Sequence, residues 1–179
     1  MKRKVFWSFS VALILAGMLF AASASAQERA QSPASDMAFG LGYQGMWVQG
    51  FLHGVSGRFW MQDDIGMEGN LYMGDFGDDL SSVGGLSLFL IEGKFMYAPV
   101  VRENSRFYFG GLLNICIYDD NDADGTILGL GPFFGAEWRY KELPEIGFNF
   151  DLGFKYFHDS DDVYDVWGFD TTWGIHYYF

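Results

Sequence analysis

The last fourteen residues, 166–179, alternate between two kinds of side chain. One set is almost entirely apolar or aromatic, and it runs in steps of two from Trp167 to Phe179; the other set is small, polar or charged. Successive side chains of a β-strand point to opposite faces, so this period of two predicts a strand. The strand is longer than is usual in soluble sheets. An alternating segment of about ten residues is typical of a transmembrane β-strand.

The same alternation recurs along the chain and predicts seven more strands. The eight expected strands cover approximately residues 37–47, 52–61, 65–73, 86–97, 106–118, 126–140, 146–157 and 166–179. Pro132 interrupts the sixth, and because proline cannot donate to a ladder we expect a bulge there. The fold class is therefore all-β, an eight-stranded antiparallel up-and-down barrel.

The connections alternate in length. Short turns follow the second, fourth and sixth strands, whereas longer acidic segments lie near 74–85, 119–125 and 158–165. Four hairpins bring both ends of a barrel to one side, which in membrane barrels is the periplasmic side of the short turns. We therefore expect the acidic loops to be extracellular and both termini periplasmic.

The first 26 residues predict a secretory signal peptide. A basic leader, Lys2 to Lys4, precedes an apolar stretch and the small-residue site Ala24-Ser25-Ala26, so we expect cleavage before Gln27. The alternative is an amino-terminal anchor helix. Residues 27–36 are polar and predict a flexible periplasmic lead-in, which leaves 37–179 for the barrel.

The two faces decide between a membrane barrel and a soluble one. A lipocalin-like barrel turns its apolar face inward, but the apolar set here holds too many rings for the narrow interior of eight strands. Aromatic residues make up 20% of the chain, with 24 glycines and only 4 prolines. The polar set, facing the lumen, contains charges of both signs that we expect to pair as an ion-pair network. These are Arg58, Glu68, Glu92, Lys94, Glu137, Arg139, Asp151, Lys155 and Asp170.

The signal site, the hairpin series and the ending Gly-Ile-His-Tyr-Tyr-Phe together resemble the small outer-membrane barrels of the OmpA and OmpX type. The resemblance implies a Gram-negative outer membrane, contact with lipid and lipopolysaccharide, and assembly by the barrel-assembly machinery. It also implies that Trp173, Ile175, Tyr177 and Phe179 form the carboxy-terminal assembly signal. Such proteins include structural anchors, adhesion or defence factors, narrow porin-like channels and a few lipid-modifying enzymes.

The acidic loops offer one metal hypothesis. Residues 120–125 read D-x-D-x-D-G, so Asp120, Asp122 and Asp124 are candidate calcium ligands within the loop Asp119–Gly125. Gly131 stands where a calcium loop has its last acid, so we expect a weak site, and otherwise no cofactor. Without the leader the chain has eight basic and 23 acidic residues, a net charge of −15. Nucleic acid is not an expected partner.

The sequence gives little support for an enzyme or for an ion channel. His158-Asp159-Ser160 contains the residue types of a hydrolase, but neighbours in sequence do not form a relay without a spatial arrangement. His53 falls on the lipid-facing set, and His176 falls on the inward set as a hydrogen-bonding residue. Large inward rings such as Trp60 predict a plugged lumen. We therefore expect a non-enzymatic, monomeric structural or surface-interaction protein, with a low-conductance channel or a lipid-modifying enzyme as alternatives.

Overall fold

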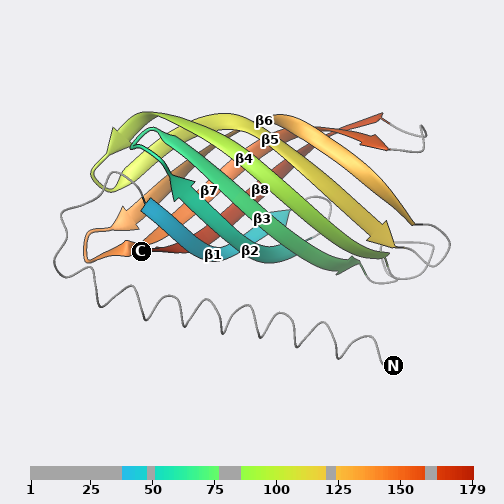
Figure 1. The fold of residues 1–179 in the computed structure, drawn as a ribbon, viewed down its shortest axis with the longest axis horizontal. Helices are drawn as coiled ribbons and strands as arrows, with labels where there is room; N and C mark the ends of the chain where they lie inside the picture. Colours follow the sequence, from blue (N-terminus) through green and yellow to red (C-terminus); the bar gives the residue numbers. More distant parts are fainter. Residues whose placement is uncertain (1–37, 48–50, 77–85, 120–123, 160–164) are drawn as a thin grey trace, which may run out of the picture. The chain divides into compact units, whose positions relative to one another are not determined.

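The computed structural model describes residues 38–47, 51–76, 86–119, 124–159 and 165–179. The expected signal peptide and lead-in lie outside these ranges. Eight antiparallel strands follow one another around a closed barrel, each bonded to its neighbours in sequence and β1 bonded to β8 (Figure 1). The strands are β1 (Ala38–Trp47), β2 (Phe51–Trp60), β3 (Ile65–Phe76), β4 (Leu86–Arg102), β5 (Ser105–Asp119), β6 (Asp124–Tyr140), β7 (Leu143–Asp159) and β8 (Asp165–Tyr178). Within the described ranges no helix is both long and apolar enough to cross a bilayer.

The register of the ladders defines the geometry of the barrel. Following paired residues from Gly42 on β1 across every strand in turn leads to Val166 on β8. Gly42 itself pairs with His176, so one circuit is staggered by ten residues. With eight strands and ordinary sheet spacings, this stagger tilts the strands by about 40° from the barrel axis.

The tilt relates strand length to membrane thickness. At about 40°, the 10-residue strands β1 and β2 span about 25 Å along the axis, the height of the apolar band in membrane barrels. β4, β6 and β7 have 17 residues each and extend well beyond that height.

All eight predicted strands are present, but several are longer than predicted. β5 and β6 remain paired out to Asp119 and Asp124, and β7 and β8 out to His158 and Asp165. These ends lie in segments expected to be acidic loops. The backbone ladder continues there although the alternation of apolar and polar residues has stopped, and only the alternation is visible in the sequence.

The prediction of a bulge at Pro132 is wrong. Pro132 pairs with Gly111 of β5, and on the other side Leu130 pairs with Tyr156 and Phe133 with Gly153, so both strands advance equally past the proline. Proline removes one hydrogen-bond donor, but no extra residue is inserted, and its side chain faces outward. The register shifts instead between Tyr97 and Val100 and between Arg139 and Tyr140, near the short turns.

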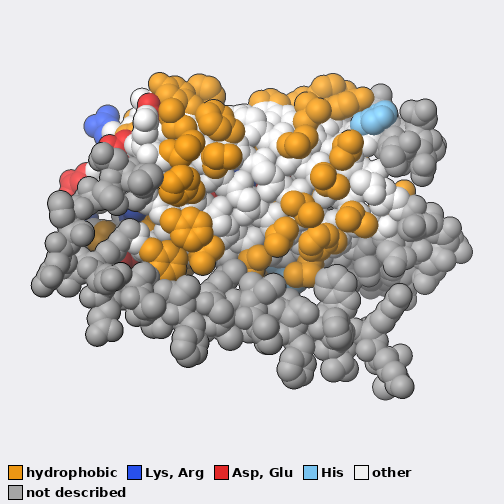
Figure 2. All heavy atoms as spheres, in the orientation of Figure 1, with side chains coloured by type: hydrophobic (Ala, Val, Ile, Leu, Met, Phe, Trp, Pro, Cys, Tyr) orange, Lys and Arg blue, Asp and Glu red, His pale blue; other side chains and the backbone are white. Residues whose placement is uncertain are grey.

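The barrel is apolar outside and charged inside, as predicted. Large rings cover its outer surface, with Phe169 79% exposed and Trp167 and Phe107 each 62% exposed. Figure 2 shows hydrophobic side chains spread over the visible flank, and the Lys, Arg, Asp and Glu side chains that it colours lie mainly at one end of that flank. The inner surface differs: Arg58, on the lumen-facing side of β2, is 0% exposed. This inverted arrangement is that of a transmembrane barrel and not of a lipocalin-like one.

Candidate functional site

The lumen holds a layer of buried charges contributed by six strands. All nine charged residues assigned to the inward set lie on the inner face, and eight of them are at most 4% exposed. Arg139, nearest the barrel mouth, has a side chain that is 21% exposed. The strands place them there because every second residue of a strand faces the same way.

The first section of the charge layer is centred on Lys155 of β7. Its ammonium group lies 2.6 Å from a carboxylate oxygen of Glu92 on β4 and 3.1 Å from one of Asp170 on β8. Glu92 also lies 3.5 Å from the ammonium of Lys94, which continues the layer towards the middle of the lumen.

Lys94 is shared by three carboxylates of the layer. Besides Glu92, its ammonium contacts Asp151 of β7 at 2.7 Å and Glu68 of β3 at 3.2 Å. The Thr172 hydroxyl donates to the same Asp151 oxygen at 3.0 Å. One ammonium group thus links acids from β3, β4 and β7 across the lumen.

Arg58 of β2 joins the middle of the layer to the mouth formed by the short turns. Its guanidinium pairs with Glu68 and lies 2.9 Å from Glu137 on β6. Glu137 also accepts two hydrogen bonds from Arg139, at 3.2 and 3.1 Å. Through these contacts the nine residues form one connected chain of ion pairs, from Asp170 to Arg139, which we call the lumen network.

Neutral side chains complete the lumen network. Four cations face five carboxylates, so one negative charge needs other donors. The Tyr108 hydroxyl donates to Asp151 at 2.5 Å, the Tyr178 hydroxyl to Glu137 at 2.5 Å, and the Asn70 amide to Glu68 at 2.7 Å. Hydrogen-bonded donors lower the cost of a buried charge. These roles cannot be recognised in the sequence, where the only signal is that all three residues lie on the inward set.

His176 behaves as the alternation predicts. It is 0% exposed, and its Nε2 lies 2.8 Å from the hydroxyl oxygen of Ser56. Both residues pair with Gly42 of β1, so they meet over the strand between them. His53, by contrast, lies on the outward face of β2. The two histidines therefore lie on opposite sides of the barrel wall.

Two apolar clusters lie on either side of the middle of the lumen network. The cluster on the side of the short turns comprises Trp60, Met96, Ala98, Tyr108, Leu112, Phe133 and Tyr178. The cluster on the opposite side comprises Met46, Leu52, Tyr72, Leu90 and Cys116. Cys116, which lies on the inward set of β5, thus fills space in an apolar layer.

The other predicted sites are only partly described. Asp120 and Asp122 lie outside the described residues, and Asp124 is placed only as the first residue of β6. Within the described ranges no group of acids, histidines and cysteines is arranged to hold a metal ion. Of the His158-Asp159-Ser160 run, His158 is paired along its backbone with Asp165 in the ladder of β7 and β8, and Ser160 lies outside the described residues.

The residues of the predicted assembly signal occupy the outer face of β8. Trp173, Ile175 and Tyr177 are 46%, 39% and 38% exposed, and Phe179 follows the last residue of the strand. Tyr43 of β1 lies beside Trp173, with ring centroids 5.8 Å apart. This apolar row therefore lies along the strand that closes the barrel.

Comparison with known proteins identifies the fold. No model of a known protein family matches the chain, and no curated protein matches it. Neisserial surface protein A, from Neisseria, is 17% identical with a TM-score of 0.51, and the match covers 83% of this chain and all of that one. The amino-terminal barrel domain of OprF from Pseudomonas aeruginosa is 16% identical with a TM-score of 0.52, covering 82% and 100%. A major outer membrane protein from Thermus thermophilus is 14% identical with a TM-score of 0.50, covering 81% and 100%.

At these identities the likeness concerns the fold. The closed ring of eight strands, the apolar exterior and the matches to whole barrels agree with one another. The chain has the fold of the small eight-stranded outer-membrane β-barrels.

Proposed function

We propose that this protein is a monomeric, non-enzymatic component of a Gram-negative outer membrane whose closed barrel serves as a rigid structural and surface-interaction element. The observation that carries the proposal is the filled lumen. A buried network of ion pairs crosses it, and apolar clusters occupy it on both sides. An interior of this kind stabilises a wall and leaves no wide water-filled path.

The lumen network supports rigidity because it connects strands that are not neighbours in the sheet. Lys94 on β4 meets Asp151 on β7, and Arg58 on β2 meets Glu137 on β6. Gln44 of β1 and Tyr108 of β5 add hydrogen bonds to it, so every strand contributes. Flattening or opening the barrel would separate buried charges, each of which is costly to leave unpaired.

The outer surface supports contact with the membrane and its surroundings. Exposed rings suit lipid contact, and the strand extensions of β4 to β7 lead into acidic segments. We propose that the acidic loops face outward, where divalent cations link carboxylates to lipopolysaccharide phosphates, and that the short turns and both termini face the periplasm. Neisserial surface protein A, by its name a surface protein, has a similar fold. Calcium binding by Asp120, Asp122 and Asp124 stays a prediction within this proposal.

A narrow channel is the alternative to this proposal, and a conductance measurement distinguishes the two. The refolded protein, inserted into a planar lipid bilayer and held at a steady voltage, is expected to give no reproducible current steps. Regular steps that scale with salt concentration would replace the structural proposal with a channel. Heat-modifiable gel mobility of the same sample shows that the inserted protein is folded, so that silence is not mistaken for failed insertion.

A further inference from the structure

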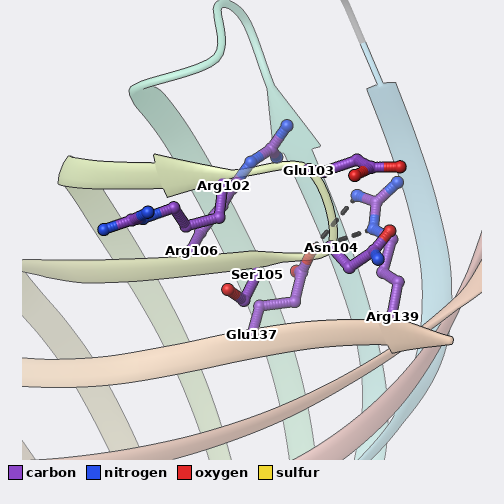
Figure 3. Close-up of a pocket in the computed structure, with 7 residues that line it drawn as sticks. All are labelled: Arg102, Glu103, Asn104, Ser105, Arg106, Glu137 and Arg139. Atoms are coloured by element: carbon purple, nitrogen blue, oxygen red, sulfur yellow. Dashed lines mark hydrogen bonds and ion pairs between the residues drawn. The ribbon is translucent and has the colours of Figure 1, made fainter. Parts of the chain in front are cut away.

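A small pocket opens beside the turn between β4 and β5, at the barrel mouth formed by the short turns. Its volume is about 60 Å³. One water molecule needs roughly 10–15 Å³ of such volume, so the pocket can take a compact group of several atoms. Figure 3 shows its lining, which consists of Arg102, Glu103, Asn104, Ser105, Arg106, Glu137 and Arg139.

Three arginines line this pocket in a chain whose net charge is −12, and their guanidinium groups extend in different directions from it (Figure 3). Their positive charge is only partly compensated. Glu137 is shared between Arg139 and Arg58, and Glu103 lies 3.8 Å from the exposed Lys141. Arg102 takes part in no ion pair with any residue that the structure describes. The pocket therefore carries a local surplus of positive charge.

Arg106 is the strongest indication of an anion-binding site. Its side chain is 15% exposed, and its buried Nη1 has no hydrogen-bond partner among the described residues. Its one ion pair within the described ranges joins Nη2 to Asp63 at 3.7 Å, and because the Asp63 side chain is 78% exposed this pair neutralises little. A buried guanidinium nitrogen without an acceptor is costly, so an acceptor from outside the chain would be favoured.

Aromatic rings hold two of the arginines in place. The guanidinium carbon of Arg106 lies 4.5 Å from the centre of the Trp60 ring, and that of Arg139 lies 3.7 Å from the centre of the Tyr178 ring. Stacking occupies the faces of the guanidinium groups and leaves their N–H edges for hydrogen bonds. In Arg139, Nε and Nη2 already donate to Glu137, so only its remaining N–H groups could donate to an anion. An anion entering the pocket would meet donors that have already lost much of their freedom.

We propose that this pocket binds a phosphate group. Guanidinium edges are matched in geometry to phosphate oxygens, and several arginines around one compact pocket suit a group with three acceptor oxygens. The group belongs either to a lipid headgroup at the rim of the barrel or to a phosphate-bearing molecule in the adjoining aqueous space. The site does not depend on the lumen being closed or on which membrane face the mouth occupies.

The test is a titration of the refolded protein with inorganic phosphate, in nanodiscs of zwitterionic lipid, at constant ionic strength set with chloride. Saturable shifts of the Asn104 and Ser105 amide resonances are expected. Arg106→Gln should weaken binding by about tenfold or more, because it removes charge-assisted hydrogen bonds. Lys141→Gln, the matched control, removes the same charge from the same mouth outside the pocket and should change binding less than about twofold.

Shifts that do not saturate would overturn the proposal, as would equal weakening by the two variants, which indicates diffuse charge attraction. If Arg106→Gln gives no heat-modifiable band, Arg102→Gln, at an exposed position, replaces it with an expected loss of severalfold. A second arm uses nanodiscs with phosphatidylglycerol. If the same amide resonances shift without added phosphate and free phosphate then binds more weakly, a lipid headgroup is the source; unchanged binding assigns the site to an aqueous phosphate.

Discussion

At the scale of single residues, the lumen tolerates charge because each charge has partners at short range. Lys94 is 3% exposed and contacts three carboxylates at 2.7 to 3.5 Å. Burying an ion is costly, and attraction between partners offsets the cost only when all of them are present. The consequences of removing one partner therefore differ from those of removing two.

Lys94→Met is expected to destabilise the folded barrel by about 3–5 kcal/mol, since it leaves buried carboxylates without their cation. Urea unfolding in lipid vesicles measures this loss. Lys141→Met, at a 67% exposed side chain, is the control and should change stability by less than about 0.5 kcal/mol. Adding Asp151→Asn to Lys94→Met should recover part of the loss. If the double variant is no more stable than Lys94→Met alone, the result argues against the ion pair between Lys94 and Asp151.

Two glycines on opposite faces provide a second test at this scale. A Cβ on Gly42, which faces the lumen, would collide with the carbonyl oxygen of Ile175, whereas a Cβ on Gly69, which faces outward, would meet nothing within 4 Å. Gly42→Ala should therefore cost about 1–3 kcal/mol, and Gly69→Ala should be neutral or stabilising by up to about 1 kcal/mol. The measurement is again urea unfolding in vesicles. Similar losses for both would show that glycine is needed for reasons other than space.

Sequence patterns predicted which way each side chain faces but not which charges meet. The alternation alone placed Lys94 and Asp151 in the lumen. Their contact depends on the ten-residue stagger around the barrel, which decides which points of β4 and β7 lie opposite each other. That stagger arises from eight ladders together, and no segment of sequence encodes it locally. The roles of Tyr108 and Tyr178 were missed for the same reason.

At the scale of one strand, β7 contains both environments in adjacent residues. Phe150 is 44% exposed on the outer face, and Asn149 is 1% exposed in the lumen. The strand also shows what sequence patterns miss at its ends, because its ladder continues to His158 after the clear alternation has ended. The middle of β7 is therefore the best place to test which side chains face the lipid and which face the lumen.

Phe150→Arg is expected to reduce stability in the bilayer by about 2–4 kcal/mol, because it places a charge among lipid chains. Asn149→Ser, one residue away, should be nearly silent, since neither amide atom of Asn149 has a hydrogen-bond partner among the described residues. The yield of folded protein in vesicles and its urea midpoint measure both variants. Equal effects would contradict the assignment of the two faces.

At the scale of the whole molecule, the closed ring leaves no open sheet edge among the described strands, because β1 bonds to β8. We expect such a ring to resist unfolding by detergent. The unboiled protein is expected to migrate differently from the boiled protein on a detergent gel, and to be found in the outer-membrane fraction. Unchanged mobility, with the protein in the soluble periplasmic fraction, would instead indicate a lipocalin-like binder of small apolar molecules.

The lumen network also bears on biogenesis. Some of its pairs, such as Arg58 with Glu68 and Lys155 with Asp170, lie on adjacent strands, whereas the contacts of Arg58 with Glu137 and of Lys94 with Asp151 join strands that are not neighbours in the sheet. Contacts of the second kind need the strands to face each other across the lumen, so we expect these charges to keep water until β1 meets β8. Dehydration of the interior is then expected to follow ring closure. The final strand, with its apolar outer row and Asp170, both seals the wall and supplies the second carboxylate partner of Lys155.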